Sequence, residues 1–293
     1  MIATSGGATQ PLAAVTGATG YLGARICTTL EAQGWRVRRL VRSPQPADAG
    51  AARYDIAGPL DPQLFESVEL LVHAAYDLTL TRQADIWRVN VEGSRRLLAA
   101  ARAAQVRRII VLSTMSAYAG TTQLYGRAKL EIEAATADVG GCAIRPGLVY
   151  SAKPAGMAGA LQKLTRLPLT PIVAANARQY PVHLDDLMAA IGTLATADTL
   201  PAGPLGIANP TSVPFREVMV ALAGLEGRRP RFAPIPWRLV YWGLRTGELL
   251  RIRLPFRADS LLGLVRPAPN VPAADEVARL GITFRPFIGQ ADA

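Results

Sequence analysis

The segment TGATGYLG at residues 16–23 limits most strongly which fold this chain can adopt. It follows the apolar run 12–15 and precedes a segment with a helical pattern. Gly17 permits a tight turn, Gly20 lets a pyrophosphate approach the backbone, and Gly23 lets the helix pack close to the strand. The N–H groups that open the helix then face the phosphates. A strand, a glycine turn and a helix in this order predict a dinucleotide-binding unit rather than an ordinary structural turn.

Short apolar runs and helix-like segments alternate through the first half of the chain. The apolar runs, which are typical of buried strands, are 12–15, 37–41, 70–73, 109–112 and 142–144. Segments typical of helices lie between several of them, at 21–33, 86–104 and 125–137. This alternation predicts an α/β fold with a Rossmann-type doubly wound parallel sheet that is covered by helices on both faces.

The pattern changes after residue 150, where proline and glycine become frequent. Helix-like stretches at 212–223 and 237–250 are separated there by irregular segments. We therefore predict a dinucleotide-binding Rossmann domain at 1–150, with a return segment near 180–206. A smaller, mostly helical substrate-binding lobe is predicted at 151–293.

Charge and hydropathy limit the partners of the protein. The formal net charge is +10, but the arginines are scattered, without a basic run or interleaved aromatic residues. We therefore expect no nucleic-acid partner and a mild attraction for anionic ligands such as phosphates. No uncharged apolar stretch reaches about 18 residues, so no membrane partner is expected. The amphipathic segment 235–255 is expected to pack in the core or between lobes, with contact to a membrane surface as the alternative.

The cysteines and the N-terminal segment bear on the compartment. Cys27 and Cys142 are too few for a disulfide framework and have no metal-ligand spacing. The first eleven residues lack the basic and apolar regions of a signal peptide. We expect a cytoplasmic protein without a metal site.

The second predicted strand indicates which dinucleotide is bound. An acidic residue at its end would bind the ribose 2′-hydroxyl of NAD, but the segment WRVRRLVRSP contains none. Arg42, just beyond the strand, and Arg38 within it offer guanidinium groups that suit a 2′-phosphate. NADP is therefore favoured over NAD, although an ordinary solvated arginine is the alternative. Asp55 and Ile56 are candidates to border the adenine.

The segment YGRAK at 125–129 is the strongest catalytic candidate. Tyr125 and Lys129 are four residues apart, so both lie on one face of a helix. A nearby ammonium, together with an oxidised nicotinamide, favours the tyrosinate and allows Tyr125 to act as general acid or base. The alternative is a surface Tyr–Lys pair that occurs by chance. Lysine is rare in this chain, which makes a chance pair less probable.

Hydroxyl groups follow the fifth apolar run, in the segment VLSTMSAYAG. Ser113, Thr114 and Ser116 lie at the carboxyl end of a predicted strand, where such sheets bind their ligands. One of these hydroxyls is therefore expected to hold the oxygen of a substrate beside Tyr125.

Taken together, these segments resemble the extended short-chain dehydrogenase/reductase family, also called the NAD-dependent epimerase/dehydratase family. The resemblance covers most of the chain. It rests on the order and spacing of TGATGYLG, LVHAA, NVEGSRRLL, LSTMSAYAG, YGRAK, IRPGLVY and VHLDD.

The resemblance implies roles for individual residues. Tyr125 and Lys129 would be the catalytic pair, Thr114 their hydroxyl partner, and Asn90 would support the catalytic helix and a proton-relay water. The implied cofactor contacts, besides Tyr125 and Lys129, are Thr16, Gly17, Thr19, Gly20, Tyr21, Leu22, Gly23, His73, Ala74, Ala75, Pro146, Gly147, Leu148 and Val149. Catalysis by His73 or His183 is not expected, because the tyrosine already fills the acid–base role.

Two departures from the family pattern narrow the chemistry. Met115 and Ser116 stand where sugar dehydratases of the family carry an Asp–Glu pair, and Leu148 stands where many nucleotide-sugar enzymes carry asparagine. We predict an NADP(H)-dependent oxidoreductase that transfers hydride to or from a secondary alcohol or ketone of a small substrate, with a sugar-like substrate left open. A nucleotide-sugar epimerase and a non-catalytic NADP-binding sensor or scaffold are the alternatives, and the sequence leaves a homodimer possible.

Overall fold

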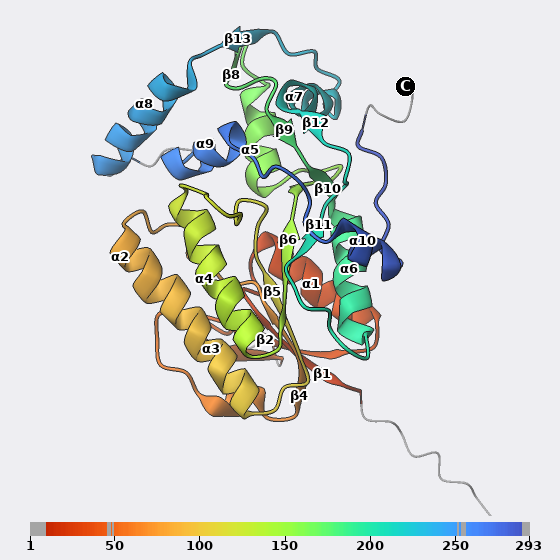
Figure 1. Cartoon of the computed structure of the whole chain (residues 1–293). Helices are drawn as coiled ribbons and strands as arrows, with labels where there is room; N and C mark the ends of the chain where they lie inside the picture. The colour runs from red at the N-terminus through yellow and green to blue at the C-terminus, as the bar shows by residue number, and fades with distance from the viewer. Residues whose placement is uncertain (1–9, 46–47, 49, 251, 253–255, 289–293) are drawn as a thin grey trace, which may run out of the picture.

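Seven parallel strands form one sheet in the larger part of the molecule (Figure 1). The computed structural model describes residues 10–288 except 46–47, 49, 251 and 253–255. The strands lie in the order β11-β6-β5-β4-β1-β2-β3, and every neighbouring pair is parallel. Their bounds are β1 Leu12–Thr16, β2 Arg36–Val41, β3 Ala51–Arg53, β4 Val68–His73, β5 Arg108–Leu112, β6 Cys142–Pro146 and β11 Leu205–Ile207.

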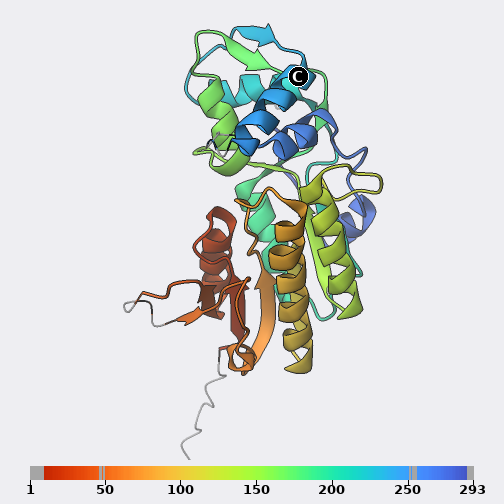
Figure 2. The same ribbon diagram turned by 90° about the vertical axis from the view of Figure 1, so that its left-hand side faces the viewer.

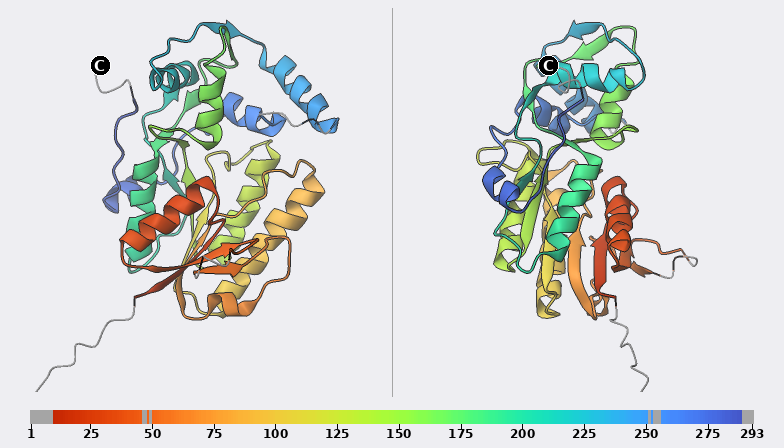
Figure 3. Two further views of the ribbon diagram at one scale, coloured as in Figure 1. Left: turned by 180° about the vertical axis from the view of Figure 1, so that it is seen from behind. Right: turned by 90° about the vertical axis from the view of Figure 1, so that its right-hand side faces the viewer.

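Helices cover both faces of this sheet. One face carries α1 (Tyr21–Ala32) and α6 (Leu184–Thr196), which lie side by side (Figure 3). The other face carries α2 (Gln83–Ile86), the π-helical turn η2 (Trp87–Val91), α3 (Glu92–Ala103) and α4 (Leu124–Asp138). A 3-10 turn, η1 (Pro62–Phe65), precedes β4. Because successive side chains of a strand alternate between faces, Leu70 joins one hydrophobic core and Leu71 the other.

The predicted fold class is confirmed. Each apolar run of the sequence forms a strand, and a fully buried parallel strand is apolar throughout because both of its faces are covered. The strands β3 and β11, three residues each, were not predicted. The helix expected at 86–104 begins earlier, at Gln83, and contains the π-helical turn.

The rest of the chain forms a lobe above the carboxyl ends of the strands (Figure 2). Three short strand pairs join its helices: β7 with β10, β9 with β12, and β8 with β13. The bounds are β7 Leu148–Tyr150, α5 Gly156–Leu164, β8 Thr170–Ile172, β9 Arg178–Gln179, β10 Pro181–His183, β12 Val213–Pro214, α7 Phe215–Gly224, β13 Phe232–Pro234, α8 Trp237–Leu249 and α9 Ala258–Val265.

The chain passes between sheet and lobe more than once. Residues 184–207 return to the sheet as α6 and β11, and α10 (Ala274–Arg279) packs against β11. Val277 and Ile282 belong to the core on that side of the sheet, whereas Phe287 packs in the core of the lobe. The domain boundary predicted at residue 150 stays a prediction.

Helix α8 departs from the expectation of core packing for 235–255. Gly247 is the one buried residue of this helix, which lies along the outer edge of the lobe (Figure 1). Val240 and Leu244 face inward, while Leu239, Trp242 and Leu249 are exposed. Residues 251 and 253–255 of the segment lie outside the described residues.

Candidate active site

The glycine turn places the start of α1 close to the carboxyl ends of β1 and β4. Gly17 has a φ of +67°, and an added Cβ would lie 2.9 Å from the backbone nitrogen of Ala75. At Gly23 a Cβ would lie 2.0 Å from the carbonyl oxygen of Gly17, so only glycine permits this approach of helix and turn. The turn therefore leaves a cradle in which the N–H groups that open α1 are free to receive an anion.

A cavity of about 360 Å³ opens in front of this turn, at the carboxyl ends of β1, β2 and β4. The predicted cofactor residues that line it are Gly17, Thr19, Gly20, Arg42, Asp55, Ile56, Ala74 and Ala75. Its lining runs from Arg42 at the end of β2 past the glycine turn to Tyr76 and Leu78, the course that a dinucleotide takes from its adenosine end in such folds. The residues present therefore fit a nicotinamide dinucleotide.

Two predicted cofactor residues support this cavity from behind and do not line it. The Thr16 hydroxyl accepts hydrogen bonds from the N–H groups of Ala74 and Ala75, at 3.0 and 3.1 Å. Its own proton is then left for Nδ1 of His73 at 2.7 Å, and Nε2 of His73 donates to Ser94 at 2.8 Å. Burial, and secondarily the charge of Lys129, lower the His73 pKa to about 3. His73 is thus a neutral structural residue.

The structure does not bring Arg38 to the cavity. Its guanidinium donates to the backbone carbonyls of Gln63, Leu64 and Glu66, so it holds the turn η1 against β2. Arg38 shares the phase of Leu40, which lines the cavity, so its earlier position in β2 and not its face keeps it away from the cavity. Tyr21, Leu22 and Gly23 likewise do not line the cavity. The Tyr21 hydroxyl lies 3.4 Å from that of Ser151.

Arg42 is the basic residue at the adenosine end of the cavity. It is exposed and makes no hydrogen bond or ion pair within the part of the chain that the structure describes. Its neighbour Arg39 is paired with Glu31 and Asp48. Asp55 accepts a hydrogen bond from the N–H of Ala57 at 3.0 Å, which orders the loop on the opposite wall. Arg42 is therefore the guanidinium that remains available to a ligand there.

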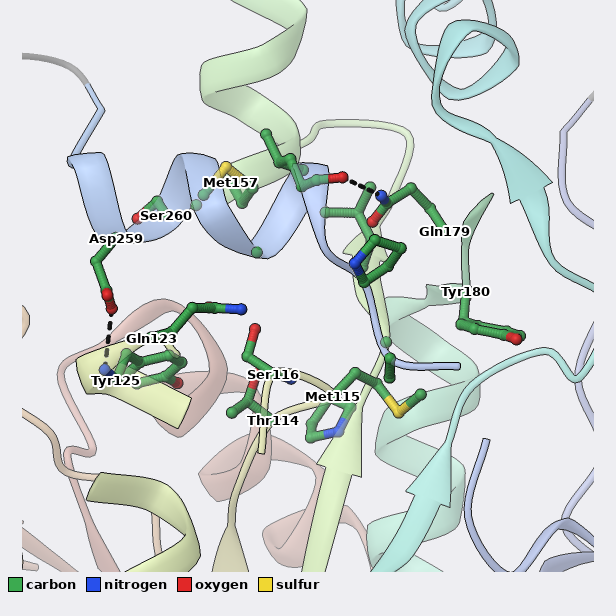
Figure 4. A pocket seen from close by; sticks show the side chains of 18 of the residues that line it. Thr114, Met115, Ser116, Gln123, Tyr125, Met157, Gln179, Tyr180, Asp259 and Ser260 are labelled. Carbon is green, nitrogen blue, oxygen red and sulfur yellow. Dashed lines mark hydrogen bonds between the residues drawn. The ribbon is translucent and has the colours of Figure 1, made fainter. Parts of the chain in front are cut away.

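A second cavity, of about 400 Å³, lies between the sheet and the lobe, and Tyr125 and Thr114 point into it (Figure 4). Burial raises the pKa of Tyr125 to about 12, a hydrogen bond with Thr114 acts against this, and the carboxylate of Asp259 adds to it. Tyr125 is therefore a protonated phenol at neutral pH. Pro146, Gly147 and Leu148 line the same cavity, whereas Val149 packs against the core below α6.

Lys129 lies one turn after Tyr125, on the buried side of α4. Its Nζ donates to the carbonyl oxygen of Leu112 at 2.6 Å and lies 6.0 Å from the centre of the Tyr125 ring. Burial lowers the pKa of Lys129 to about 8, and the carboxylate of Glu133 opposes this. The predicted pair is thus assembled, with the ammonium behind the phenol at the end of the sheet.

Asn90 acts on the catalytic residues indirectly, through the segment that it holds. Its side chain is fully buried, accepts from the N–H of Asp77 at 2.7 Å and donates to the carbonyl of Asp77 at 3.2 Å. The segment it fixes carries Tyr76, whose ring meets that of Tyr125 edge to face at 5.0 Å. The Lys129 ammonium also lies 4.8 Å from the Tyr76 ring. Asn90 therefore positions Tyr76, and Tyr76 restrains Tyr125. Tyr76 itself was missed because no sequence motif marks it.

Asp259 is a second residue that the sequence did not identify. It comes from α9 in the lobe, and its two carboxylate oxygens accept from the N–H groups of Leu124 and Tyr125, each at 2.9 Å (Figure 4). A carboxylate at this position caps the helix that carries Tyr125 and satisfies N–H groups that would otherwise lack a partner. The lobe thereby fixes the start of the catalytic helix.

The candidate hydroxyls separate into two groups. The Ser113 hydroxyl donates to Glu133, which also forms a buried ion pair with Arg145 at 2.7 Å, so Ser113 does not face the cavity. Ser116 lines the cavity with Thr114. Gln123, which was not predicted, is buried and presents its amide nitrogen to the cavity without a partner among the described residues (Figure 4).

His183 has a structural role. Its Nδ1 accepts from the N–H of Asp185 at 3.2 Å and so caps α6. Its ring contacts that of Tyr150 edge to face at 5.2 Å.

The sequence profile of the NAD dependent epimerase/dehydratase family matches residues 13–197, more than half of the chain. The chain belongs to this family. The curated relatives named below are reductases. The chain is therefore a nicotinamide-dinucleotide enzyme of the oxidoreductase or epimerase type, as the sequence predicted. The preference for NADP over NAD stays a prediction.

Among curated proteins, the chain is 28% identical over 233 residues to the ceramide reductase of Caulobacter vibrioides, covering 76% of this chain and 73% of that protein. A ketoreductase of a farnesyl dihydroquinoline oxide from Stigmatella aurantiaca is 38% identical over 128 residues, 41% of this chain and 36% of that protein. Among solved structures, MoeE5 in complex with UDP-glucuronic acid and NAD has a TM-score of 0.72, at 22% identity and 94% coverage of both chains. This last likeness shows the shared fold.

The pH dependence of this family member should report on Lys129. Because the pKa of Lys129 is lowered to about 8, the ammonium loses its proton above that pH and no longer stabilises a tyrosinate at Tyr125. We expect kcat/KM for the catalysed reaction to be level below pH 8 and to fall by about tenfold per pH unit above it. The Lys129→Arg variant keeps its charge over this range, so its profile should stay level whatever its absolute rate. Parallel profiles for the two proteins would show that another group titrates.

Proposed function

We propose that this protein is an NADPH-dependent ketoreductase whose substrate carries its carbonyl on a bulky apolar skeleton. The observation that carries the proposal is the wall of the cavity in front of Tyr125. Its apolar lining includes Leu78, Met115, Leu148, Met157, Leu264 and Pro267. Such a wall favours an apolar skeleton, with a few polar groups to orient it.

The charged groups of this wall are already engaged within the protein. Arg257 donates to the carbonyls of Leu78 and Leu80, at 2.7 Å each, and Asp259 caps α4. Among the described residues that line the cavity, Arg257 is the one cation, and these two carbonyls occupy both of its terminal nitrogens, which a diphosphate would otherwise bind. This favours a ketone on an apolar skeleton over the sugar-like substrate that the sequence left open.

A smaller apolar cavity extends the space toward the lobe. It measures about 160 Å³ and shares Leu264 with the cavity at Tyr125. All of its lining residues are apolar: Leu161, Leu164, Pro171, Val173, Phe215, Met219, Val240, Leu244, Phe256, Leu261 and Leu264. Rotation of the Leu264 side chain would join the two spaces and admit an aliphatic chain. The names of the curated relatives, a ceramide reductase and a farnesyl-bearing ketoreductase, agree with such a substrate.

The residues of the site suit reduction. The cavity at the glycine turn would hold NADPH, which would supply the hydride. The Thr114 hydroxyl orients the carbonyl oxygen of the substrate, and the protonated phenol of Tyr125 donates its proton to that oxygen as the alcohol forms. Lys129 stabilises the resulting tyrosinate until solvent returns the proton. A pKa near 12 keeps Tyr125 protonated and therefore ready for this direction of reaction.

Cofactor consumption tests the proposal. Purified protein, once denatured, should release little bound dinucleotide, and added NADPH should be oxidised one for one with alcohol formed from long-chain or polycyclic ketones. Stoichiometric bound cofactor, with product formed from a nucleotide sugar and no NADPH consumed, would establish an epimerase instead.

A variant that narrows the cavity at Tyr125 tests whether the substrate binds there. A Cβ at Gly263 would lie 3.1 Å from the Gln123 amide oxygen and 3.3 Å from the Ser116 hydroxyl, so Gly263→Val narrows the cavity. We expect roughly tenfold lower kcat/KM for bulky ketones, with NADPH binding unchanged. Gly224→Val is the matched control, because a Cβ at Gly224 meets nothing within 4 Å. Equal kcat/KM in both variants would place the substrate elsewhere.

A further inference from the structure

Helix α8 presents an apolar surface to solvent. Leu239, Trp242, Leu249 and Leu250 recur with helical spacing on its outward side, and their exposed fractions lie between 65% and 82%. Ile252, just beyond the helix, is 54% exposed. The opposite side, with Val240 and Leu244, faces the lobe. The helix is thus apolar on both sides, and burial within this chain accounts for only one of them.

The same part of the chain concentrates positive charge. Between the end of α7 and the start of α9, residues 225–257 contain eight arginines and two glutamates, a formal charge of +6 out of +10 for the whole chain. The two glutamates are engaged. Glu226 pairs with Arg166 and Arg228. Glu248 accepts from the N–H of Ala258 at 2.8 Å and forms an ion pair with Arg245 at 3.3 Å. The outward side of α8 therefore carries no acidic residue.

Aromatic rings and arginines lie together along this helix. Trp237 meets Tyr241, and Tyr241 meets Trp242, edge to face. The guanidinium of Arg238 lies 5.7 Å from the centre of the Trp237 ring. Arg238 and Arg245, seven residues apart, are stacked along one flank of the exposed apolar side. Tryptophan, leucine and flanking arginines are typical of helices that lie in the headgroup region of a bilayer.

We propose that α8, with its outward residues Leu239, Trp242, Leu249 and Leu250, docks on the surface of an anionic lipid bilayer. The apolar side enters the headgroup boundary, and Arg238 and Arg245 contact lipid phosphates. No helix in the described part of the chain is long and apolar enough to cross a bilayer, so the contact is with the surface. The charge favours lipid over a second copy of the chain, because the segment 225–257 carries a formal charge of +6 and two such segments that meet would repel one another.

The position of α8 relative to the substrate cavity is consistent with this docking. Exposed Ile252 lies five residues before Arg257, which lines the cavity at Tyr125, and Phe256 lines the apolar cavity behind it. A bilayer under α8 would thus lie beside the substrate site. The docking itself does not depend on the proposed activity, and it is measured without substrate.

Vesicle binding tests the proposal. The parent protein should co-sediment with vesicles of phosphatidylcholine containing about one third phosphatidylglycerol, and bind pure phosphatidylcholine about tenfold more weakly. Trp242→Ser combined with Leu249→Ser, and separately Arg238→Gln combined with Arg245→Gln, should each weaken binding to the anionic vesicles by about tenfold. All four positions are exposed, so melting temperatures should stay close to that of the parent.

Matched controls replace residues of the same kind elsewhere. Val220→Ser removes an exposed apolar residue from α7, and Arg25→Gln combined with Arg102→Gln removes two exposed charges from α1 and α3; neither should change binding. Absence of binding to anionic vesicles at low salt would overturn the proposal, as would equal losses in the controls. A dimer that the Trp242→Ser, Leu249→Ser protein cannot form would show instead that a second copy covers this face.

Discussion

Replacement of Tyr125 by phenylalanine is expected to lower turnover by roughly 10²- to 10⁴-fold, the usual share of general acid catalysis. The ring stays, so its edge-to-face contact with Tyr76 at 5.0 Å is kept, and only the proton donor is lost. The phenol lines the substrate cavity and does not line the cavity at the glycine turn. NADPH affinity, measured by fluorescence titration, should therefore change by no more than a few-fold.

Tyr76 provides the matched control for this experiment. Its ring is adjacent, but its buried hydroxyl has no hydrogen-bond partner among the described residues, and burial raises its pKa. Tyr76→Phe removes the same atom from the neighbouring ring and should leave turnover within a few-fold of the parent. If Tyr76→Phe were the damaging change and Tyr125→Phe the mild one, the proton would come from Tyr76.

The sequence predicted the strands whose own residues determine their structure. The runs 12–15, 70–73 and 109–112 form strands because buried parallel strands are apolar at every position. The short strands β3 and β11 are stabilised by pairing with β2 and β6 rather than by their own composition, and three residues give no periodic signal.

The candidate site shows the same limit: neighbours within a motif could be predicted, and contacts between distant segments could not. Tyr125, Lys129 and Thr114 lie near one another, as the motifs suggested, because a helix and the end of an adjacent strand fix their spacing; their catalytic roles stay a prediction. Asp259 lies 134 residues after Tyr125 in the sequence, and its contact with α4 exists only because the lobe folds over the sheet. Arg38 shows the reverse case. Its place in the sequence suited a phosphate ligand, but backbone carbonyls of η1 occupy its guanidinium.

The proposed preference for NADPH over NADH is expected to depend on Arg42, and Arg42→Ala should remove most of it. The guanidinium lies at the adenosine end of the cavity, where a 2′-phosphate distinguishes the two cofactors. A charge-assisted contact with a phosphate contributes about 1.5–3 kcal/mol. Its loss should therefore weaken NADPH binding by roughly ten- to a hundredfold, while NADH, which lacks that phosphate, binds as before.

Arg39→Ala is the control for this change, because it removes an arginine from the same strand that is already paired with Glu31 and Asp48. It should leave the ratio of the two dissociation constants unaltered, even if loss of the ion pairs lowers the melting temperature slightly.

Salt gives a further check, since a contact between charges at an exposed site weakens as ionic strength rises. NADPH binding by the parent should therefore be salt-dependent and that by the Arg42→Ala protein much less so. Equal affinity of the parent for NADPH and NADH would contradict the assignment and leave NAD as the working cofactor, with Arg42 an ordinary solvated residue.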